Sequence, residues 1–133
     1  MEIICLDTNI LIAHKRAKKA DKNKTSLYRL STQAYRFAVS SITVYELLRS
    51  DNQDEDHYWK TMFANMEILP FDAACAEQAA IIYKDLKQKG QLIEAEDLFI
   101  GATAQYHRLK LATGNQRHFE RIIGLELMPV NPL

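Results

Sequence analysis

The stretch that most constrains the fold is a short apolar run near the start of the chain, which ends at a carboxylate. Residues 3–6 read Ile-Ile-Cys-Leu, and the polar triplet Asp7-Thr8-Asn9 follows directly. A short apolar run bounded by polar residues is typical of a strand buried on both faces of a parallel sheet. The triplet favours turns and helix caps, so the strand must stop there. Because ligands bind at the carboxyl ends of strands in open parallel sheets, we expect Asp7 to lie at a functional edge.

The alternation of apolar strands with helical periodicity continues along the chain. It predicts an α/β layered fold with a largely parallel sheet. The expected strands cover residues 3–6, 36–40, 68–71, 109–113 and 125–130. The expected helices begin near residue 10 and cover 25–33, 41 onward, 55–65, 73–89, 95 onward and 117–123.

Several helices carry local signals that predict their ends and buried faces. Ser41 is the expected cap of its helix, with Ile42, Tyr45 and Leu48 on one face. The helix over 73–89 should begin at the cap Asp72 and end at Gly90. Its predicted apolar stripe contains Cys75, Ala79, Ile82 and Leu86. Gly101 and Ala104 share a helix face with Asp97, which would let that helix approach the sheet closely.

Length and composition indicate one domain over residues 1–133, with a sizeable core. The hydrophobic fraction is 47%, and 17 basic residues balance 17 acidic ones, so any basic patch must be local. Residues 14–24 form such a basic segment, expected to continue the first helix outward before a loop at 21–24. The two cysteines indicate core thiols in a reducing cytoplasm. We find no membrane-spanning run and no signal peptide.

Four oxygen-bearing side chains fall at predicted strand or helix ends. Asp7 follows the first strand, Glu46 lies in the helix after the second, Asp97 opens a helix, and Asn115 follows the fourth strand. Parallel strands would bring all four to one sheet edge. Oxygen ligands without a histidine or thiol cluster favour Mg²⁺ or Mn²⁺ over zinc. A cation held by carboxylates activates water and neutralises phosphate charge, so the pattern predicts metal-assisted phosphodiester hydrolysis.

Each of these residues also has a purely structural interpretation. Asp7 and Asn115 are common turn or cap residues. Thr43-x-x-Glu46 matches a capping box. Asp97 suits the positive end of a helix dipole. Their joint placement at one edge favours the functional interpretation.

Four segments together resemble the PIN domain family, and most of all the VapC-type toxins of toxin–antitoxin pairs. They are Leu-Asp-Thr-Asn-Ile-Leu-Ile at 6–12, Ser-Ser-Ile-Thr-Val-Tyr-Glu-Leu at 40–47, residues 90–93 with Asp-Leu-Phe-Ile-Gly-Ala at 97–102, and Ala-Thr-Gly-Asn-Gln-Arg-His-Phe at 112–119. The segments follow in the family's order and cover nearly the whole chain.

The resemblance implies a three-layer α/β/α fold with a five-stranded parallel sheet in the order 3-2-1-4-5. It also implies an Mg²⁺- or Mn²⁺-dependent endoribonuclease, frequent homodimers, and a cognate antitoxin that blocks the site. The family's acids map onto Asp7, Glu46 and Asp97 as metal ligands. Asn115 stands at a fourth position that is often Asp, and Thr113 matches a hydroxyl near the site. Glu94 is either an extra ligand or a first-turn acid, and we favour the latter.

Other residues suggest how RNA and a partner would be contacted. The basic stretch over 15–24 is either an RNA-backbone track or, as we favour, a solvated helix end. Arg117 and His118 follow Asn115 closely and are placed to touch a phosphate. The aromatic residues Tyr58, Trp59 and Phe63 indicate core or dimer packing, with an antitoxin groove as the alternative. Two rival functions remain: a PIN nuclease that processes RNA without being a toxin, and a non-catalytic PIN scaffold that binds RNA or protein.

Overall fold

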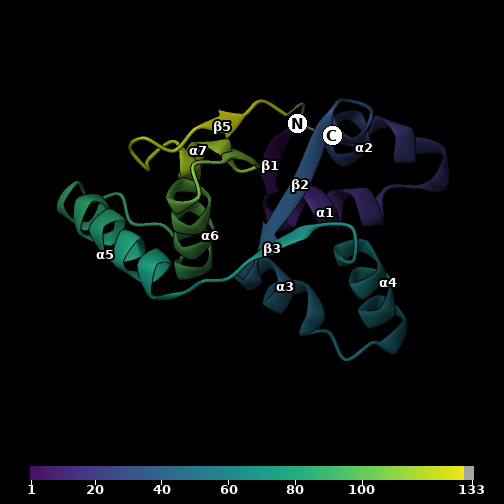
Figure 1. Cartoon of the computed structure of the whole chain (residues 1–133), viewed down its shortest axis with the longest axis horizontal. Coiled ribbons are helices and arrows are strands. Elements are labelled where there is room, and N and C mark those ends of the chain that lie inside the picture. Colours follow the sequence, from purple (N-terminus) through teal and green to yellow (C-terminus); the bar gives the residue numbers. More distant parts are fainter. Residues whose placement is uncertain (131–133) are drawn as a thin grey trace.

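A computed structural model describes residues 1–130 of the chain, with one five-stranded sheet at its centre (Figure 1). The strand order is β3-β2-β1-β4-β5, and all four neighbouring pairs are parallel. This confirms the predicted sheet and its order. The strands are β1 Glu2–Leu6, β2 Tyr35–Ser40, β3 Glu67–Leu69, β4 Lys110–Ala112 and β5 Leu127–Met128.

Helices cover both faces of the sheet and complete the predicted three layers (Figure 1). One layer holds α1 Thr8–Arg16, the 3₁₀ helix η1 Lys19–Lys24, α2 Ser26–Ser31, α3 Ser41–Leu48 and α4 Gln53–Phe63. The other holds α5 Ala73–Gln88, α6 Ala95–Tyr106 and α7 Gln116–Phe119.

Alternation along the central strand explains why the layers divide in this way. Ile4 and Leu6 of β1 pack with α1, α2 and α4, whereas Cys5 between them packs with α5, α6 and α7. Successive side chains of a strand point to opposite faces, so a strand that is apolar at every position must be covered twice. All three residues are fully buried. The apolar run at the start of the chain is therefore the centre of both cores.

The cap of α3 lies one residue earlier than expected. Ser40, the last residue of β2, accepts hydrogen bonds from the backbone N–H groups of Ile42 and Thr43, so the predicted cap at Ser41 is wrong. The Ser41 hydroxyl instead accepts from the Phe71 N–H. The helix therefore starts directly at the end of the strand.

The buried face of α3 also differs from the predicted one. Thr43 and Leu47 are buried, and Tyr45 is 59% exposed. The predicted face of Ile42, Tyr45 and Leu48 is therefore wrong for Tyr45, which points to solvent.

The basic segment over residues 14–24 continues α1 only as far as Arg16. The helix ends at Arg16, and the residues expected to form a loop belong to η1. Lys22 Nζ donates to the carbonyl oxygens of His14 and Lys15 at 2.5 and 2.7 Å. These carbonyls lack helical partners at a helix C-terminus, so Lys22 satisfies them and turns the chain back.

Helix α4 begins two residues before its predicted start. Asn52 accepts hydrogen bonds from the Asp54 and Glu55 N–H groups and caps the helix. This cap places Asp54, Glu55 and Asp56 in the first turn of α4. Negative side chains are stabilised there by the helix dipole.

Helix α5 follows its predicted start and stripe closely. Asp72 caps it through the Cys75 N–H at 3.0 Å, and the four stripe residues are buried. It ends one residue before its predicted limit, and Gly90 follows with φ of +66°, a conformation that favours glycine.

Gly101 has a different neighbour from the one expected. A Cβ built on it would lie 2.6 Å from Cδ1 of Ile122 and 3.4 Å from ring atoms of Phe119. The missing side chain thus allows close approach to α7 and the turn after it, while α6 as a whole does contact the sheet, at β2 and β4.

The cysteines and the helix lengths agree with the composition. Cys5 and Cys75 are buried and free, as predicted for core thiols. Within residues 1–130, no helix is both long and apolar enough to cross a membrane.

Candidate active site

Asp7 occupies the centre of the sheet's carboxyl edge, directly after β1. Its side chain is 3% exposed. Oδ1 accepts the Thr8 N–H at 2.8 Å, and Oδ2 accepts the Thr113 hydroxyl at 2.7 Å. The first bond also makes Asp7 the cap of α1, which confirms the structural interpretation of this residue. Because both oxygens are held, the carboxylate has one fixed orientation.

Burial makes the ionised form of Asp7 costly. Desolvation raises the pKa of this carboxyl from 3.8 to about 6, and the charges of Asp97 and Glu46 add to the rise. Hydrogen bonds from Thr113 and Thr8 oppose it. A buried acid beside two other acids is the arrangement in which such a rise is expected. The edge is therefore short of positive charge.

Glu46 reaches this edge from the middle of α3 and is held by hydroxyls. Its Oε1 accepts the Thr8 hydroxyl at 2.7 Å, and the Thr8 oxygen lies 3.0 Å from the Thr43 hydroxyl oxygen. Thr8 has one hydroxyl proton, which it gives to Glu46, so Thr43 must be the donor in the second contact. The capping-box interpretation is wrong, because Ser40 caps α3 and the Thr43 hydroxyl contacts Thr8.

Asp97 lies in the first turn of α6, and its carboxyl is half-buried. Desolvation raises its pKa, and the charges of Glu94 and Glu46 raise it further, while His118 lowers it. His118 Nδ1 is 3.8 Å from Asp97 Oδ2. Glu94 caps the backbone of α6 without a side-chain hydrogen bond.

The loop after β4 closes the edge. The Asn115 N–H donates to the Thr113 hydroxyl oxygen at 2.9 Å, and the Asn115 side-chain nitrogen lies 2.7 Å from His118 Nδ1. Thr113 and His118 thus touch Asp7 and Asp97 respectively, whereas Asn115 contacts His118 and no acid. Arg117 is exposed.

Three site residues escaped the sequence reasoning. Thr8 and Thr43 orient Glu46, and the Asn9 side-chain oxygen accepts the Gly114 N–H at 3.1 Å, tying the first turn of α1 to the loop after β4. The position of Thr8 beside Asp7 was an available signal. No sequence signal pointed to the contact of Thr43 with Thr8, because its spacing from Glu46 suggested a capping box.

The donor atoms suit a hard cation in kind. Asp7, Glu46 and Asp97 supply carboxylate oxygens; the charges of Asp97 and Glu46 raise the pKa of Asp7, and the charge of Glu46 raises the pKa of Asp97. Within residues 1–130, no group of three His, Cys, Asp or Glu side chains is placed so that it could hold a metal ion by itself. Mg²⁺ does not require one, since it keeps several waters and binds through one or two carboxylates. The residues present therefore fit such an ion.

Comparison with known proteins agrees with this arrangement. The family model described as PIN domain matches residues 4–125. Ribonuclease VapC1 of Rickettsia felis is 34% identical, over 96% of this chain and 96% of that protein.

Two solved structures share the fold across nearly their whole lengths. VapBC-1 from nontypeable Haemophilus influenzae has a TM-score of 0.80 and 25% identity, covering 95% of this chain and 96% of that one. A toxin–antitoxin complex from Klebsiella pneumoniae has a TM-score of 0.71 and 26% identity, covering 92% and 94%. With the matched family model and an aligned VapC ribonuclease, this chain belongs to the PIN domain family and, within it, to the VapC ribonucleases.

Proposed function

We propose that this chain is the toxin of a VapBC-type toxin–antitoxin pair, an endoribonuclease that hydrolyses RNA phosphodiester bonds. The observation that carries the proposal is the buried carboxylate of Asp7, held by two hydrogen bonds beside Glu46 and Asp97. An edge of this kind favours a divalent cation and rejects a bare phosphate. The family membership supports the same activity.

Asp7, Glu46 and Asp97 would hold Mg²⁺ or Mn²⁺. When bound, such a cation supplies an activated water and neutralises charge on the phosphate. The chain's own contribution is orientation: Thr113 and the Thr8 N–H fix Asp7, and the Thr8 hydroxyl fixes Glu46.

The substrate contacts come from the loop after β4. We assign Arg117 and His118 to the phosphate, because Arg117 is exposed and His118 lies beside Asp97. Thr113 contributes to substrate binding indirectly, because its hydroxyl donates a hydrogen bond to Asp7. Asn115 contributes to the catalytic edge by holding the His118 ring in place through a hydrogen bond.

The partner proposed here is a cognate antitoxin that covers the site. An apolar groove of about 800 Å³ runs between α2 and α4 and offers anchors for it. Trp59 and Phe63 are buried in the core, so only Tyr58 of the three predicted aromatics lines this groove. Its other apolar lining residues include Leu27, Tyr28, Phe37, Met62 and Met66.

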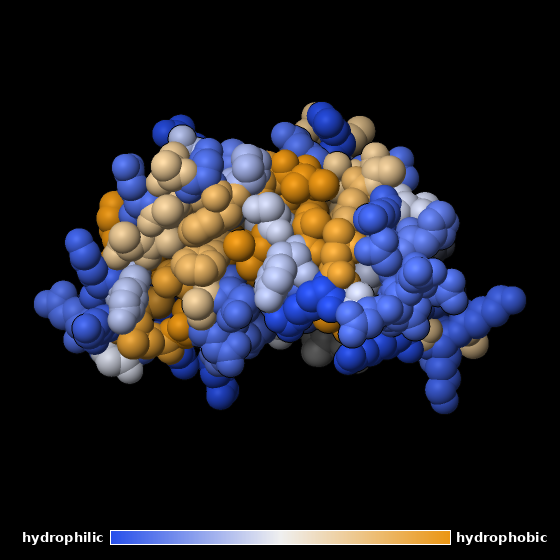
Figure 2. Space-filling model, turned by 90° about the horizontal axis from the view of Figure 1, so that it is seen from below, coloured by the Kyte–Doolittle hydropathy of each residue, from blue (hydrophilic) through white to orange (hydrophobic). Residues whose placement is uncertain are grey.

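We also propose a homodimer and action in the cytoplasm. A second apolar groove of about 600 Å³ lies between α5 and α6, lined by Phe71, Tyr83, Leu92 and Ile93 among others. Figure 2 shows apolar side chains gathered toward the α5 end of the molecule. Such a surface suits a self-complementary contact. Free buried thiols suit a reducing compartment.

The decisive experiment is cleavage of a mixed RNA pool with Mg²⁺, with Mn²⁺ and with EDTA, followed by mapping of the cut ends. Cleavage with either metal and none in EDTA is the expected result. Full activity in EDTA would contradict the metal site. Absence of cleavage under all three conditions would leave the non-catalytic scaffold.

A second experiment separates the toxin from a nuclease of RNA processing. The small gene next to this one is co-expressed, and co-purification and relief of growth arrest are measured. Tyr28→Asp in the groove should weaken the complex, whereas Tyr106→Asp, exposed on α6, should not. A neighbouring product that neither binds nor relieves arrest would favour RNA processing.

A further inference from the structure

A small hollow lined partly by charged side chains lies beside Glu46. Its volume is about 290 Å³, and its lining comes from α1, α3 and the start of α4. Three cationic side chains and two carboxylates line it: Lys15, Arg16, Arg49, Glu46 and Glu55. The net charge of these lining side chains is therefore positive, although the hollow adjoins the acidic edge of the sheet.

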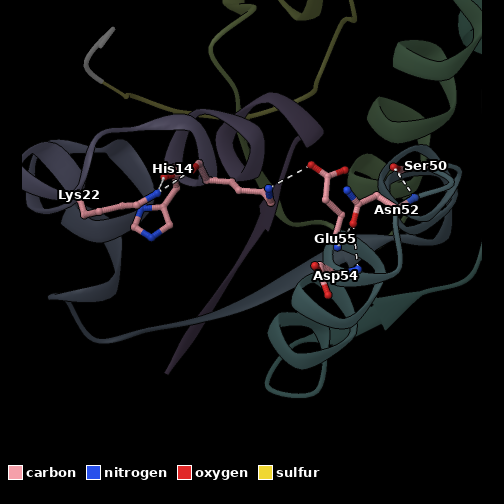
Figure 3. A network of polar contacts seen from close by, with 7 residues as sticks. His14, Lys22, Ser50, Asn52, Asp54 and Glu55 are labelled. Atoms are coloured by element: carbon pink, nitrogen blue, oxygen red, sulfur yellow. Dashed lines mark hydrogen bonds and ion pairs between the residues drawn. The ribbon is translucent and has the colours of Figure 1, made fainter.

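Three of the six Lys and Arg side chains in residues 14–24 already have partners. Lys15 pairs with Glu55 at 3.1 Å and joins α1 to α4, and Lys24 pairs with Asp21 at 3.4 Å. Lys22 caps α1 through the carbonyl oxygens at its end (Figure 3). The segment as a whole is thus not a free RNA track. The Arg16 side chain forms no hydrogen bond or ion pair within residues 1–130, and its charge acts on Glu55 only from a longer distance, where it helps to lower the pKa of that carboxyl.

Arg49 is equally free of ion pairs among the described residues, and it is placed by its own helix. It follows Glu46 by three residues, a spacing that puts the two side chains on adjacent parts of the α3 surface. Its guanidinium lies 5.6 Å from the ring centre of the exposed Tyr45. A guanidinium stacked on an aromatic ring keeps its N–H edges for another ligand.

Two unpaired guanidinium groups from different helices thus face one hollow beside a catalytic carboxylate. Guanidinium groups match phosphate oxygens in geometry and charge. We propose that Arg16 and Arg49 bind a phosphate of the RNA strand that flanks the phosphate being cut, with Tyr45 positioning Arg49. This subsite rests on the proposed ribonuclease function and directs the strand from the acidic edge across α3.

The test measures RNA binding separately from cleavage. Anisotropy of a short fluorescein-labelled single-stranded RNA is followed in EDTA across a KCl series. The proteins are the wild type, Arg16→Gln, Arg49→Gln, Arg49→Lys and the control Lys84→Gln on α5. Far-UV circular dichroism checks that each is folded.

Each glutamine variant should weaken binding about tenfold. Each should also reduce the slope of log Kd against log salt by about 0.7, the value for one phosphate contact on a single strand. Arg49→Lys should keep the slope while losing part of the affinity, and Lys84→Gln should match the wild type.

Wild-type affinity and slope in both glutamine variants would overturn the subsite. An equal loss in Lys84→Gln would overturn it too, because it would indicate a diffuse effect of charge. RNA that is bound through Arg16 and Arg49 but never cut with Mg²⁺ or Mn²⁺ would contradict the proposed function and leave the subsite standing.

Discussion

Replacing Asp7 with asparagine should make the metal-free protein more stable at neutral pH while removing its activity. The carboxyl has a pKa of about 6 in the folded chain, chiefly because it is buried. In the unfolded chain the pKa is about 3.9. Between these values the folded state keeps a proton that the unfolded state has lost. Stability therefore falls as pH rises from about 4 to about 6 and then levels off.

The size of the effect follows from the shift. Two pKa units at 1.36 kcal/mol each give a destabilisation of about 3 kcal/mol at pH 7.5. Asparagine removes this destabilisation because it carries no charge. Its side-chain oxygen is a weaker hydrogen-bond acceptor than a carboxylate oxygen, however, and its NH₂ group faces the Thr113 hydroxyl, which must then donate its proton to another acceptor. That loss costs about 1 kcal/mol. The net gain for Asp7→Asn is about 1–2 kcal/mol at pH 7.5, and it should vanish or reverse at pH 4.

The assay is urea unfolding in EDTA at several pH values from 4 to 8, followed by circular dichroism. The difference between Asp7→Asn and wild type isolates Asp7, since other shifted groups, such as Asp97 and His14, contribute to both proteins. Asp85→Asn on α5 is the control, because Asp85 pairs with Lys89 and lies away from the site. It should give no gain in stability.

Two results would refute the reasoning. One is a lower stability of Asp7→Asn than of wild type across the whole pH range, which would mean that the two hydrogen bonds outweigh burial. The other is a wild-type stability that does not decline between pH 4 and 6 relative to the variant. Either would show that the folded chain does not raise the pKa of Asp7 as the burial of its carboxyl predicts.

Three further predictions concern other parts of the molecule. Asp97→Asn should leave the melting temperature unchanged or slightly higher and reduce RNA cleavage at least about a hundredfold; near wild-type cutting by the folded variant would remove Asp97 from the site. Gly101→Ala should destabilise by about 1–3 kcal/mol in urea unfolding, because its Cβ meets Ile122; adding Ile122→Val, which deletes the clashing Cδ1, should restore part of the loss, and no recovery would contradict the contact. Lys22→Met should cost about 1–2 kcal/mol through the uncapped end of α1; a thermal melt matching that of Lys84→Met would show that this cap contributes nothing.

The architecture was predictable because its signals are local. β1, β2 and β4 each contain a short apolar run that ends at polar residues, and β1 is apolar on both faces. That pattern requires a covered parallel sheet. The boundaries were harder: Ser40 and Ser41 are equally good caps by type, and the structure selects Ser40, the last residue of β2.

The grouping of the three acids was predictable from the sequence, whereas the hydrogen bonds that hold them were not. Chain order and strand ends place Asp7, Glu46 and Asp97 at one edge. Which hydroxyl holds which acid depends on side-chain direction, which periodicity does not determine. Thr8 donates to Glu46 from another element, across 38 positions of the chain. Likewise, the basic segment looked continuous in sequence, yet Lys22 turns inward and only geometry separates it from Arg16.

The costs at the site also explain its surroundings. Burying Asp7 weakens the fold at neutral pH, so the elements that carry the acids need independent anchors. They have them: α1 is held by Lys22 and by the Lys15–Glu55 pair, and α6 packs so closely on Ile122 that it needs Gly101. None of these contacts involves an acid of the edge. The acids can therefore repel one another without moving the helices, which keeps the edge ready for a cation at the expense of stability.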